Sequence, residues 1–297
     1  MTAILVFGAA GQVGRELVDQ VWPDGLHAIG LDRAGADVTD RAAVTRAIAA
    51  QRPALVVNAA AYTAVDKAEQ EPARAWAVNR DGAANLAAAC AAHDLPLVHL
   101  STDYVFDGAK AGAYDEDDPV CPLGVYGASK EAGEAAIRAV LPRHVILRTA
   151  WVFGVHGHNF VKTMLRLGGE RAELGIVADQ RGCPTEAADI ARAVARVAAA
   201  LLGTPEAARL GTFNYVGAPP TTWHGFATAI FERAAAAGRK VPALRAIATA
   251  DYPTPARRPA NSVLATGKLA RVYAIAPCDW PVALDRVLGA LAAPASA

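Results

Sequence analysis

The chain begins with an apolar stretch that runs directly into a glycine-rich turn. Residues 3–7 are apolar, and Gly8, Gly11 and Gly14 follow with the spacing G-x-x-G-x-x-G before a helical pattern starts. Glycines let a backbone approach a pyrophosphate, and the first N–H groups of a helix carry partial positive charge. A strand, a glycine turn and a helix in this order predict the first unit of a dinucleotide-binding sheet, rather than an ordinary glycine-rich turn.

The alternation of strand and helix continues along the first 150 residues. Strands are expected at five apolar runs, which are residues 3–7, 27–31, 54–61, 96–100 and 144–148. The first helix is expected to face the sheet with four apolar side chains, which are Val13, Leu17, Val18 and Val21. This alternation predicts an α/β fold, a Rossmann-like doubly wound parallel sheet with helices on both faces.

The pattern changes after residue 150. Helices are expected near residues 161–167, 186–202, 223–237 and 281–292, and strands near 174–177 and 211–216. We expect residues 1–150 and about 176–212 to form the dinucleotide-binding domain. Residues from about 151 to 175 and from 213 to 297 are expected to form a smaller C-terminal lobe that binds the substrate.

An acidic residue ends the second predicted strand. Asp32 lies eighteen residues after Gly14, where an acid that accepts from the adenosine 2′-hydroxyl is expected. Arg33 beside it is suited to a 2′-phosphate, so the two neighbours favour NADH and NADPH respectively. In the loop that follows, Asp37 and Val38 are placed near the adenine, and Asp40 is a plausible N-cap for a helix through about residue 51.

Two further strands end in residues that suit a ligand site. The third strand ends in small side chains up to Ala61, which leave room for a ligand over the edge of the sheet. The fourth is followed by Ser101, Thr102 and Asp103. A hydroxyl at this point is able to hold a substrate carbonyl oxygen together with Tyr126.

Tyr126 and Lys130 stand four residues apart at the start of a helical pattern, so they share one face of the helix. A tyrosine titrates near a pKa of about 10, too high for easy proton exchange at neutral pH. A cation about 4 Å away would lower that pKa by up to about 3. The pair therefore predicts a tyrosine that protonates a carbonyl oxygen while hydride arrives at its carbon, although a bare Y-x-x-x-K is common by chance.

Composition narrows the range of partners. The chain of 297 residues carries 29 basic and 29 acidic side chains, so no nucleic-acid partner is expected. No apolar run reaches the roughly 20 residues of a membrane span, and the first residues do not resemble a signal peptide. Four scattered cysteines without a C-x-x-C motif are typical of reduced thiols in a cytoplasmic protein.

Two other clusters remain. His156 and His158 have no acid or cysteine close by in the sequence, so no metal site is expected there. Arg257 and Arg258 lie in a proline-rich segment and are able to hold phosphates, although surface arginines in a turn are an equal alternative.

Taken together, the motifs resemble the extended short-chain dehydrogenase/reductase superfamily, and within it the reductases that complete dTDP-L-rhamnose synthesis. The stretches that carry the resemblance cover nearly the whole chain in order: GAAGQVGREL, VVNAAAYTAVDKAE, STDYVFDG, VYGASKEAGE, RTAWVFG, NFVKTMLRL, DQRGCPT, TTWH and YPTPARRPANS. The resemblance implies reduction of the C4 keto group of dTDP-4-dehydro-β-L-rhamnose with NADPH or NADH.

The resemblance also implies roles for individual residues. Tyr126 would donate the proton, Lys130 would lower its pKa and hold the nicotinamide ribose, and Thr102 would bond the keto oxygen. The stretches that match cofactor-binding segments contain Gly8, Gly11, Gln12, Val13, Gly14, Asp32, Arg33, Asp37, Val38, Ala61, Tyr62, Thr63, Tyr126 and Lys130. The positions expected at the sugar nucleotide are Thr102, Asp103, Trp151 and Arg258.

The same resemblance leaves alternatives. Nucleotide-sugar 4,6-dehydratases and epimerases share the Tyr/Lys pair, but dehydratases need a carboxylate where this chain has Tyr104. A non-catalytic regulatory subunit is disfavoured by the intact trio Thr102, Tyr126 and Lys130. Some relatives are dimers bridged by magnesium, and Glu16 fits one such position, but residues 187–189 do not clearly supply the others. We therefore expect no metal and a monomer or homodimer.

Overall fold

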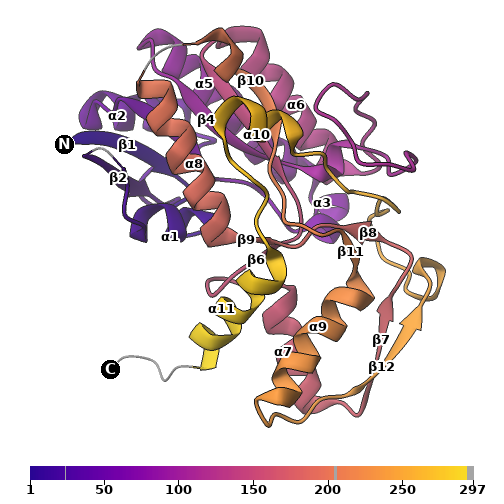
Figure 1. Ribbon diagram of the computed structural model, residues 1–297. Coiled ribbons are helices and arrows are strands. Elements are labelled where there is room, and N and C mark those ends of the chain that lie inside the picture. The colour runs from indigo at the N-terminus through magenta and orange to yellow at the C-terminus, as the bar shows by residue number, and fades with distance from the viewer. Residues whose placement is uncertain (24, 204–205, 293–297) are drawn as a thin grey trace.

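The computed structural model describes residues 1–23, 25–203 and 206–292. Two parts can be followed in Figure 1, a larger domain around a central sheet and a smaller lobe of helices beneath it. Both the first strand and the glycine turn belong to the larger domain, and the last helix that the structure describes belongs to the lobe.

The central sheet has six parallel strands in the order β10-β5-β4-β3-β1-β2. These strands are β1 (Thr2–Phe7), β2 (Leu26–Leu31), β3 (Leu55–Asn58), β4 (Leu97–Thr102), β5 (His144–Thr149) and β10 (Gly211–Asn214). The order reverses direction at β1, which is the mark of a doubly wound sheet, so the predicted fold class is confirmed. All carboxyl ends of the strands lie at one edge.

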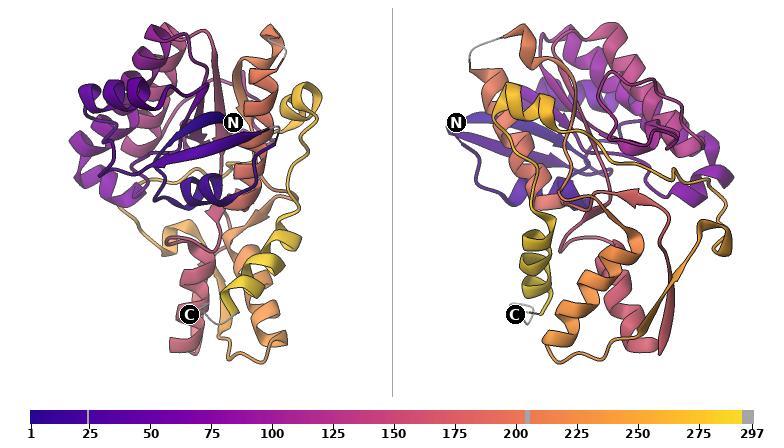
Figure 2. Two further views of the ribbon diagram at one scale, coloured as in Figure 1. Left: turned by 90° about the vertical axis from the view of Figure 1, so that its left-hand side faces the viewer. Right: turned by 45° about the vertical axis from the view of Figure 1, so that its right-hand side comes forward.

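Helices cover both faces of the sheet, as Figure 2 shows edge-on. One face packs on α1 (Gln12–Asp19), α8 (Ala187–Leu202) and α10 (Gly267–Tyr273), and the other on α2 (Arg41–Gln51), α5 (Gly82–Ala92) and α6 (Val125–Val140).

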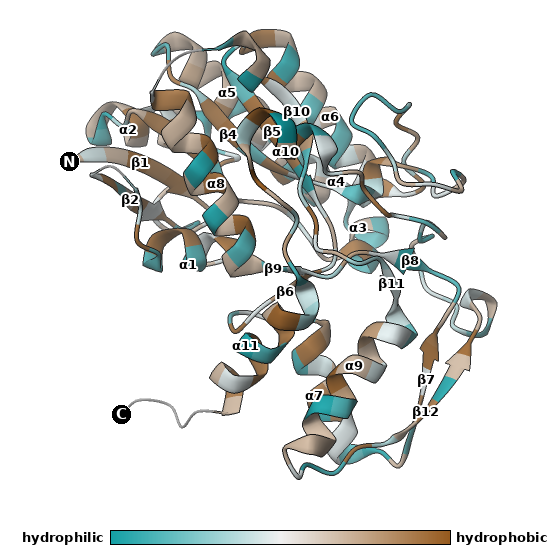
Figure 3. Cartoon of the chain, in the orientation of Figure 1, coloured by the Kyte–Doolittle hydropathy of each residue, from teal (hydrophilic) through white to brown (hydrophobic). Residues whose placement is uncertain are grey.

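The packing of β1 on both faces of the sheet explains why its sequence is apolar throughout. Ile4 and Val6 belong to the core beneath α8, whereas Leu5 and Phe7 belong to the core beneath α5. Alternate side chains of a strand point to opposite faces, so a strand covered on both sides needs an unbroken apolar run. In Figure 3 this strand and β4 are accordingly coloured as hydrophobic.

Between β3 and β4 the chain forms short helices. They are α3 (Val65–Gln70), α4 (Pro72–Trp76) and a π-helical turn (Ala77–Asp81) that continues into α5. A single π-helical turn within a helix is often found next to a functional site.

The smaller lobe has its own core. It consists of α7 (Phe160–Glu170), α9 (Trp223–Ala236), α11 (Trp280–Ala292) and the parallel pair β7 (Glu173–Val177) and β12 (Ala243–Ile247). Four two-residue strands connect the lobe to the sheet domain: β6 (Val152–Phe153), β8 (Arg181–Gly182), β9 (Thr185–Glu186) and β11 (Thr221–Thr222).

Three details differ from the sequence expectations. Val21 is 97% exposed, because α1 ends at Asp19 before reaching it, and Val18 lies within α1 but is 38% exposed. The segment 267–273 forms α10 on the sheet domain, although we assigned it to the lobe, because Leu269 and Tyr273 pack into the core beneath α8. The strand β12 was not predicted, since its side chains are mostly exposed.

Two further observations bear on the expectations. Asp40 caps α2 as predicted, and its carboxylate accepts from the backbone N–H groups of Ala42 and Ala43. Within the described ranges, the helices are too short or too polar to cross a bilayer.

Candidate active site

Helix α6 carries Tyr126 and Lys130 to the carboxyl edge of the sheet, next to the end of β4. Gly127 makes this approach possible, because a Cβ there would lie 2.1 Å from the carbonyl oxygen of Tyr104. At its start, the N–H of Val125 donates to Glu69 Oε1 at 2.8 Å. Glu69 thus supplies an acceptor to an otherwise unbonded N–H of the first turn.

Tyr126 lies half-buried with its ring edge-on to Tyr104, 5.5 Å between centroids. Burial raises the pKa of Tyr126 to about 12, and only the hydrogen bond with the Thr102 hydroxyl acts against it. The sequence argument expected the ammonium of Lys130 to lower this pKa. That expectation was wrong for the chain alone, because desolvation is the largest cause and the amine is bonded elsewhere.

Lys130 is 1% exposed, and its amine contacts two groups of β4. Nζ donates to the carbonyl oxygen of Leu100 at 2.6 Å and lies 3.2 Å from His99 Nε2. The other ring nitrogen of His99 is 2.9 Å from Asn58 Nδ2. Burial lowers the pKa of Lys130 to about 8, while Glu134 opposes this shift.

Sequence reasoning missed His99 and Asn58. Both lie inside apolar strands, where a polar residue breaks an otherwise regular pattern. That interruption was the available signal, since buried polar side chains need partners. The sequence did not reveal these partners, because Asn58 and His99 are 41 residues apart and His99 and Lys130 are 31 residues apart.

Thr102 is the last residue of β4, two residues after Leu100, and Asp103 follows it. The Thr102 hydroxyl donates to Asp103 Oδ1 at 3.0 Å and accepts from the N–H of Tyr104 at 3.2 Å. Burial raises the pKa of Asp103 to about 6. Its Oδ2 has no well-formed hydrogen bond among the described residues, although the Ser262 hydroxyl is close enough to lower the pKa partly.

The glycine turn is shaped for close contacts. Gly8 has a φ of +84°, and a Cβ there would lie 2.5 Å from the N of Ala60. At Gly14, a Cβ would lie 2.0 Å from the Gly8 carbonyl oxygen. The turn is followed by α1, in which Gln12 and Val13 are the first residues and Gly11 offers no capping side chain. Its first N–H groups are therefore available to an anion.

A hollow of about 380 Å³ lies beside this turn and is lined by Ala9, Ala10, Gly30, Leu31, Asp32 and Gly35. A Cβ at Gly30 would come within 2.6 Å of Val18, so only glycine leaves this cradle its shape. Asp32 Oδ1 accepts from the N–H of Gly35 at 2.8 Å, which orients the carboxylate. The residues present thus fit the adenosine end of a dinucleotide.

The neighbouring charged residues pair with each other. Arg33 Nε lies 2.9 Å from Asp37 Oδ2, and the arginine side chain is 74% exposed. Bonds from Thr39 and this pairing lower the pKa of Asp37. Val38 is buried, and its carbonyl oxygen accepts from Asn85 Nδ2 at 3.0 Å, so this part of the loop is fixed.

The segment Ala61, Tyr62 and Thr63 follows β3 at the same edge. The N–H of Tyr62 donates to Asn79 Oδ1 at 2.8 Å, and Asn79 Nδ2 donates back to the Tyr62 carbonyl at 3.1 Å. Asn79 belongs to the π-helical turn and also donates to Ser129 Oγ at 3.0 Å. This amide therefore ties the segment to α6.

Trp151 lies where β5 passes into the lobe. It has a φ of +47°, a left-handed conformation that is unfavourable for a bulky residue. Its ring stacks on Trp223 with centroids 3.5 Å apart and planes 7° apart. A Cβ at Gly182 would lie 2.4 Å from the indole, so the ring is held between the two.

Arg258 is already paired. Its Nη2 lies 2.8 Å from Asp66 Oδ2, and its Nη1 lies 3.1 Å from Asp66 Oδ1. The arginine thereby joins the lobe to α3 of the sheet domain. Arg257 is exposed.

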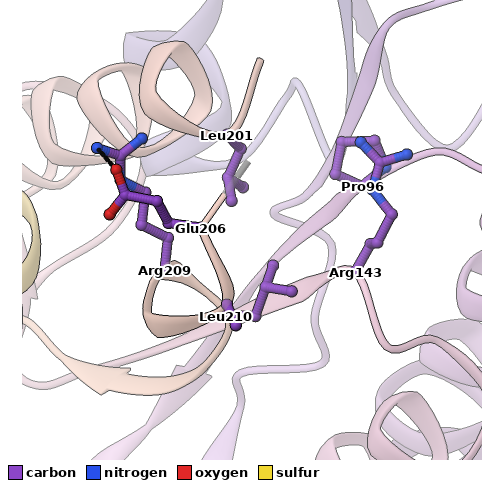
Figure 4. Close-up of a pocket in the computed structure, with 7 residues that line it drawn as sticks. Pro96, Arg143, Leu201, Glu206, Arg209 and Leu210 are labelled. Atoms are coloured by element: carbon purple, nitrogen blue, oxygen red, sulfur yellow. Dashed lines mark ion pairs between the residues drawn. The ribbon is translucent and has the colours of Figure 1, made fainter. Parts of the chain in front are cut away.

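A second hollow, of about 280 Å³, lies at the opposite edge of the sheet (Figure 4). It is lined by Pro96, Arg143, Leu201, Glu206, Ala207, Arg209 and Leu210. Pro96 and Arg143 precede β4 and β5, so this hollow is at the amino ends of the strands. It contains none of the predicted site residues.

One histidine of the H-x-H pair lies near two acidic side chains of α1. His156 Nε2 lies 3.8 Å from Glu16 Oε1 and 4.0 Å from Asp19 Oδ2. In the part of the chain that the structure describes, no three acidic, histidine or cysteine side chains come together as metal ligands.

The doubly wound sheet, its glycine turn and the Tyr126/Lys130 helix define an extended short-chain dehydrogenase/reductase. Within that class, the family described as RmlD substrate binding domain matches residues 1–293, and the chain belongs to this family.

Named relatives agree along the whole length. A dTDP-4-dehydrorhamnose reductase of Aggregatibacter actinomycetemcomitans is 44% identical and covers 97% of this chain and 98% of its own. A solved dTDP-4-dehydrorhamnose reductase of Clostridium acetobutylicum has a TM-score of 0.90 at 36% identity, covering 98% of this chain and 99% of its own. That of Bacillus anthracis, solved in complex with NADP, has a TM-score of 0.88 at 34% identity, covering 98% and 100%.

Proposed function

We propose that this protein is a dTDP-4-dehydrorhamnose reductase, which reduces the C4 keto group of dTDP-4-dehydro-β-L-rhamnose to dTDP-L-rhamnose. The observation that carries the proposal is the full-length similarity to reductases of this name. The gathering of Thr102, Tyr126 and Lys130 at one edge of the sheet supports it.

NADPH is the proposed cofactor, and it supplies hydride from its nicotinamide when bound. The relative solved with NADP supports this choice. In this chain, the N–H groups at the start of α1 would bind the pyrophosphate, and Asp32 would bind the adenosine ribose. Arg33 is exposed and would turn from Asp37 to a 2′-phosphate, so it favours NADPH over NADH.

The chain's own residues would handle the proton. Tyr126 would donate its hydroxyl proton to the C4 oxygen, because a phenol with a pKa of about 12 is protonated at neutral pH. The Thr102 hydroxyl would bond the same oxygen and orient it. Asp103 has a buried oxygen without a well-formed bond to any residue that the structure describes, which suits a sugar hydroxyl as donor.

The lobe would bind the rest of the sugar nucleotide. Trp151 is half-buried with its indole fixed between Trp223 and Gly182, so the part of the ring that stays exposed would contact the sugar nucleotide. Arg258 would bind a phosphate only by leaving Asp66, so its predicted role requires a change in this ion pair.

Replacement of Tyr126 by phenylalanine tests the proposal. We expect Y126F to lose about 10²–10⁴-fold in turnover of the keto-sugar, because the proton donor is removed. Binding of NADPH, followed by fluorescence titration, should stay nearly unchanged. Y273F is the matched control, since the Tyr273 hydroxyl is bonded to the Arg209 carbonyl and Tyr273 packs on the face of the sheet opposite to α6.

The assay also separates the alternatives. A reductase oxidises one NADPH for each keto-sugar, whereas an epimerase or a 4,6-dehydratase regenerates its cofactor. Full turnover by Y126F, or turnover of the dTDP-sugar without net oxidation of NADPH, would contradict the proposal. Parallel assays with NADH measure the contribution of Arg33.

We further propose that the protein works in the cytoplasm as a monomer or homodimer. Its four cysteines, Cys90, Cys121, Cys183 and Cys278, are all free thiols, which suits a reducing compartment. Light scattering during size-exclusion chromatography measures the oligomeric state directly.

A further inference from the structure

His99 is a buried histidine, 1% exposed, that contacts a polar side chain through each ring nitrogen. Nδ1 lies 2.9 Å from Asn58 Nδ2, and Nε2 lies 3.2 Å from Lys130 Nζ. Because both neighbours carry N–H groups, the position of the single ring proton decides which contacts are hydrogen bonds.

The orientation of Asn58 is fixed by the backbone. Its Oδ1 accepts from the N–H of Ala60 at 3.0 Å. A flipped amide would place two N–H donors against each other at that point, and it would leave a buried group unbonded. Asn58 Nδ2 is therefore the atom that faces His99, and it donates to His99 Nδ1.

This bond decides the tautomer of His99. A ring nitrogen that accepts carries no proton, so the proton of a neutral imidazole must be on Nε2. The ring is neutral, because burial keeps the pKa of His99 well below its usual value. Nε2 therefore points an N–H at the amine of Lys130.

We infer that His99, held by Asn58, is a positioning residue whose Nε2–H donates to Lys130 and favours the neutral amine of that lysine. An ammonium has no lone pair and would face this N–H as a second donor. A neutral amine accepts from Nε2, donates to the Leu100 carbonyl at 2.6 Å and keeps one N–H for another partner.

The other groups that face Lys130 do not change the direction of this effect. Glu134, one turn further along α6, favours the ammonium. It is itself bonded by Arg148, Arg138 and Ser101, so its charge is largely compensated. A lowered pKa of about 8 for Lys130 agrees with the bonding pattern.

For the proposed reduction, the consequence is that Lys130 changes its charge near neutral pH instead of remaining a fixed cation. This step rests on the proposed function, whereas the bonding argument does not. The decisive measurements are therefore made on the protein without substrate.

Nitrogen-15 spectra of the histidine rings report the tautomer. We expect the His99 ring, assigned by its loss in H99F, to show the proton on Nε2. Carbon-13 spectra of the lysine Cε atoms, with Lys130 assigned by its loss in K130M, report the pH at which this lysine titrates. In the wild type we expect a midpoint near 8.

The H99F variant then tests whether His99 Nε2 donates to Lys130 or accepts from it. If Nε2 donates, its removal takes away a bond to the neutral amine, and the midpoint should rise by about one pH unit, a tenfold change. If Nε2 instead accepts from an ammonium, the midpoint falls. H144F is the matched control, because His144 is a buried histidine on β5 bonded to the Leu141 carbonyl, and it should leave the midpoint in place.

A proton on Nδ1 in the wild type, or a midpoint that falls in H99F, would overturn the inference. Should H99F fail to fold, H99Q supplies the assignment of the His99 ring, and the wild-type tautomer decides alone. In the activity assay, the alkaline limit should move in H99F as the Lys130 midpoint moves. Absence of turnover in the wild type would contradict the proposed function and leave the tautomer and midpoint results standing.

Discussion

Lys130 and Glu134 are two buried charged residues one turn apart on α6, and they differ in how completely they are bonded. Glu134 accepts from Arg148 at 2.7 and 3.0 Å, from Ser101 at 2.5 Å and from Arg138 at 2.9 Å. These bonds lower the pKa of Glu134 despite its full burial. Lys130 has one clear acceptor, and burial lowers its pKa instead.

The difference separates a structural ion pair, Arg148 and Glu134, from Lys130, a residue proposed to take part in the reaction. A fully bonded carboxylate fixes α6 against β4 and β5 and holds its charge over a wide range of pH. An incompletely bonded amine with a lowered pKa exchanges protons near neutral pH, which suits the role proposed for Lys130. The ion pair of Arg148 and Glu134 thus holds in place the helix that carries Tyr126 and Lys130, the two residues proposed to take part in the reaction.

The largest expected effect comes from breaking the ion pair between Arg148 and Glu134. R148M should lower the free energy of unfolding by about 3–5 kcal/mol, because it leaves the Glu134 carboxylate buried without its main partner. Urea denaturation measures this. The double variant E134L/R148M should recover much of the loss, since neither charge then remains, and equal losses in both variants would show that the ion pair itself is not responsible.

The next effect concerns the incompletely bonded group. The pKa of Lys130 is lowered from 10.5 to about 8, so its protonation opposes folding below about pH 8, and this cost disappears as the pH rises to 10.5. The stability of the wild type should therefore gain about 3 kcal/mol relative to K130M over that interval. Urea denaturation at several pH values measures the difference, and a constant difference would exclude the lowered pKa.

Local pattern predicted most of the fold. Four strands of the sheet, β1, β3, β4 and β5, are mostly buried apolar runs bounded by glycine or helical periods, so each could be located from its neighbours in the sequence. Val21 was misjudged because its burial depends on where α1 ends. The strand β12 was missed because it forms only by pairing with β7. In β12, a short run interrupted by Arg245 carries no alternation of apolar and polar residues that would mark a strand.

Only those parts of the site that belong to sequence motifs could be predicted. Tyr126 and Lys130 share a helix face, and Thr102 ends a strand, so their meeting follows from topology. The pairing of Lys130 with His99 joins residues 31 positions apart, and that of Arg258 with Asp66 joins residues 192 apart. Such pairs depend on how the elements pack, and no spacing rule contains that information.

Asp103 extends the comparison to a carboxylate that lacks the bonds of Glu134. Burial raises its pKa from 3.8 to about 6, so its ionisation opposes folding above about pH 6 and not below pH 3.8. D103N should therefore stabilise the fold by up to about 3 kcal/mol at neutral pH, less the cost of an unbonded amide N–H, and should show no such gain in acid. Thermal unfolding at both pH values measures it.

The smallest effect is expected at an ion pair with good geometry and poor burial. Arg258 and Asp66 bond through two pairs of atoms, as Arg148 and Glu134 do, but Asp66 is 40% exposed. Water screens such a pair, so D66N should cost at most about 1 kcal/mol in the free energy of unfolding. A loss as large as that of R148M would mean that burial does not decide the difference between the two pairs, and that docking of the lobe depends on Arg258. Urea denaturation of both variants under the same conditions makes that comparison directly.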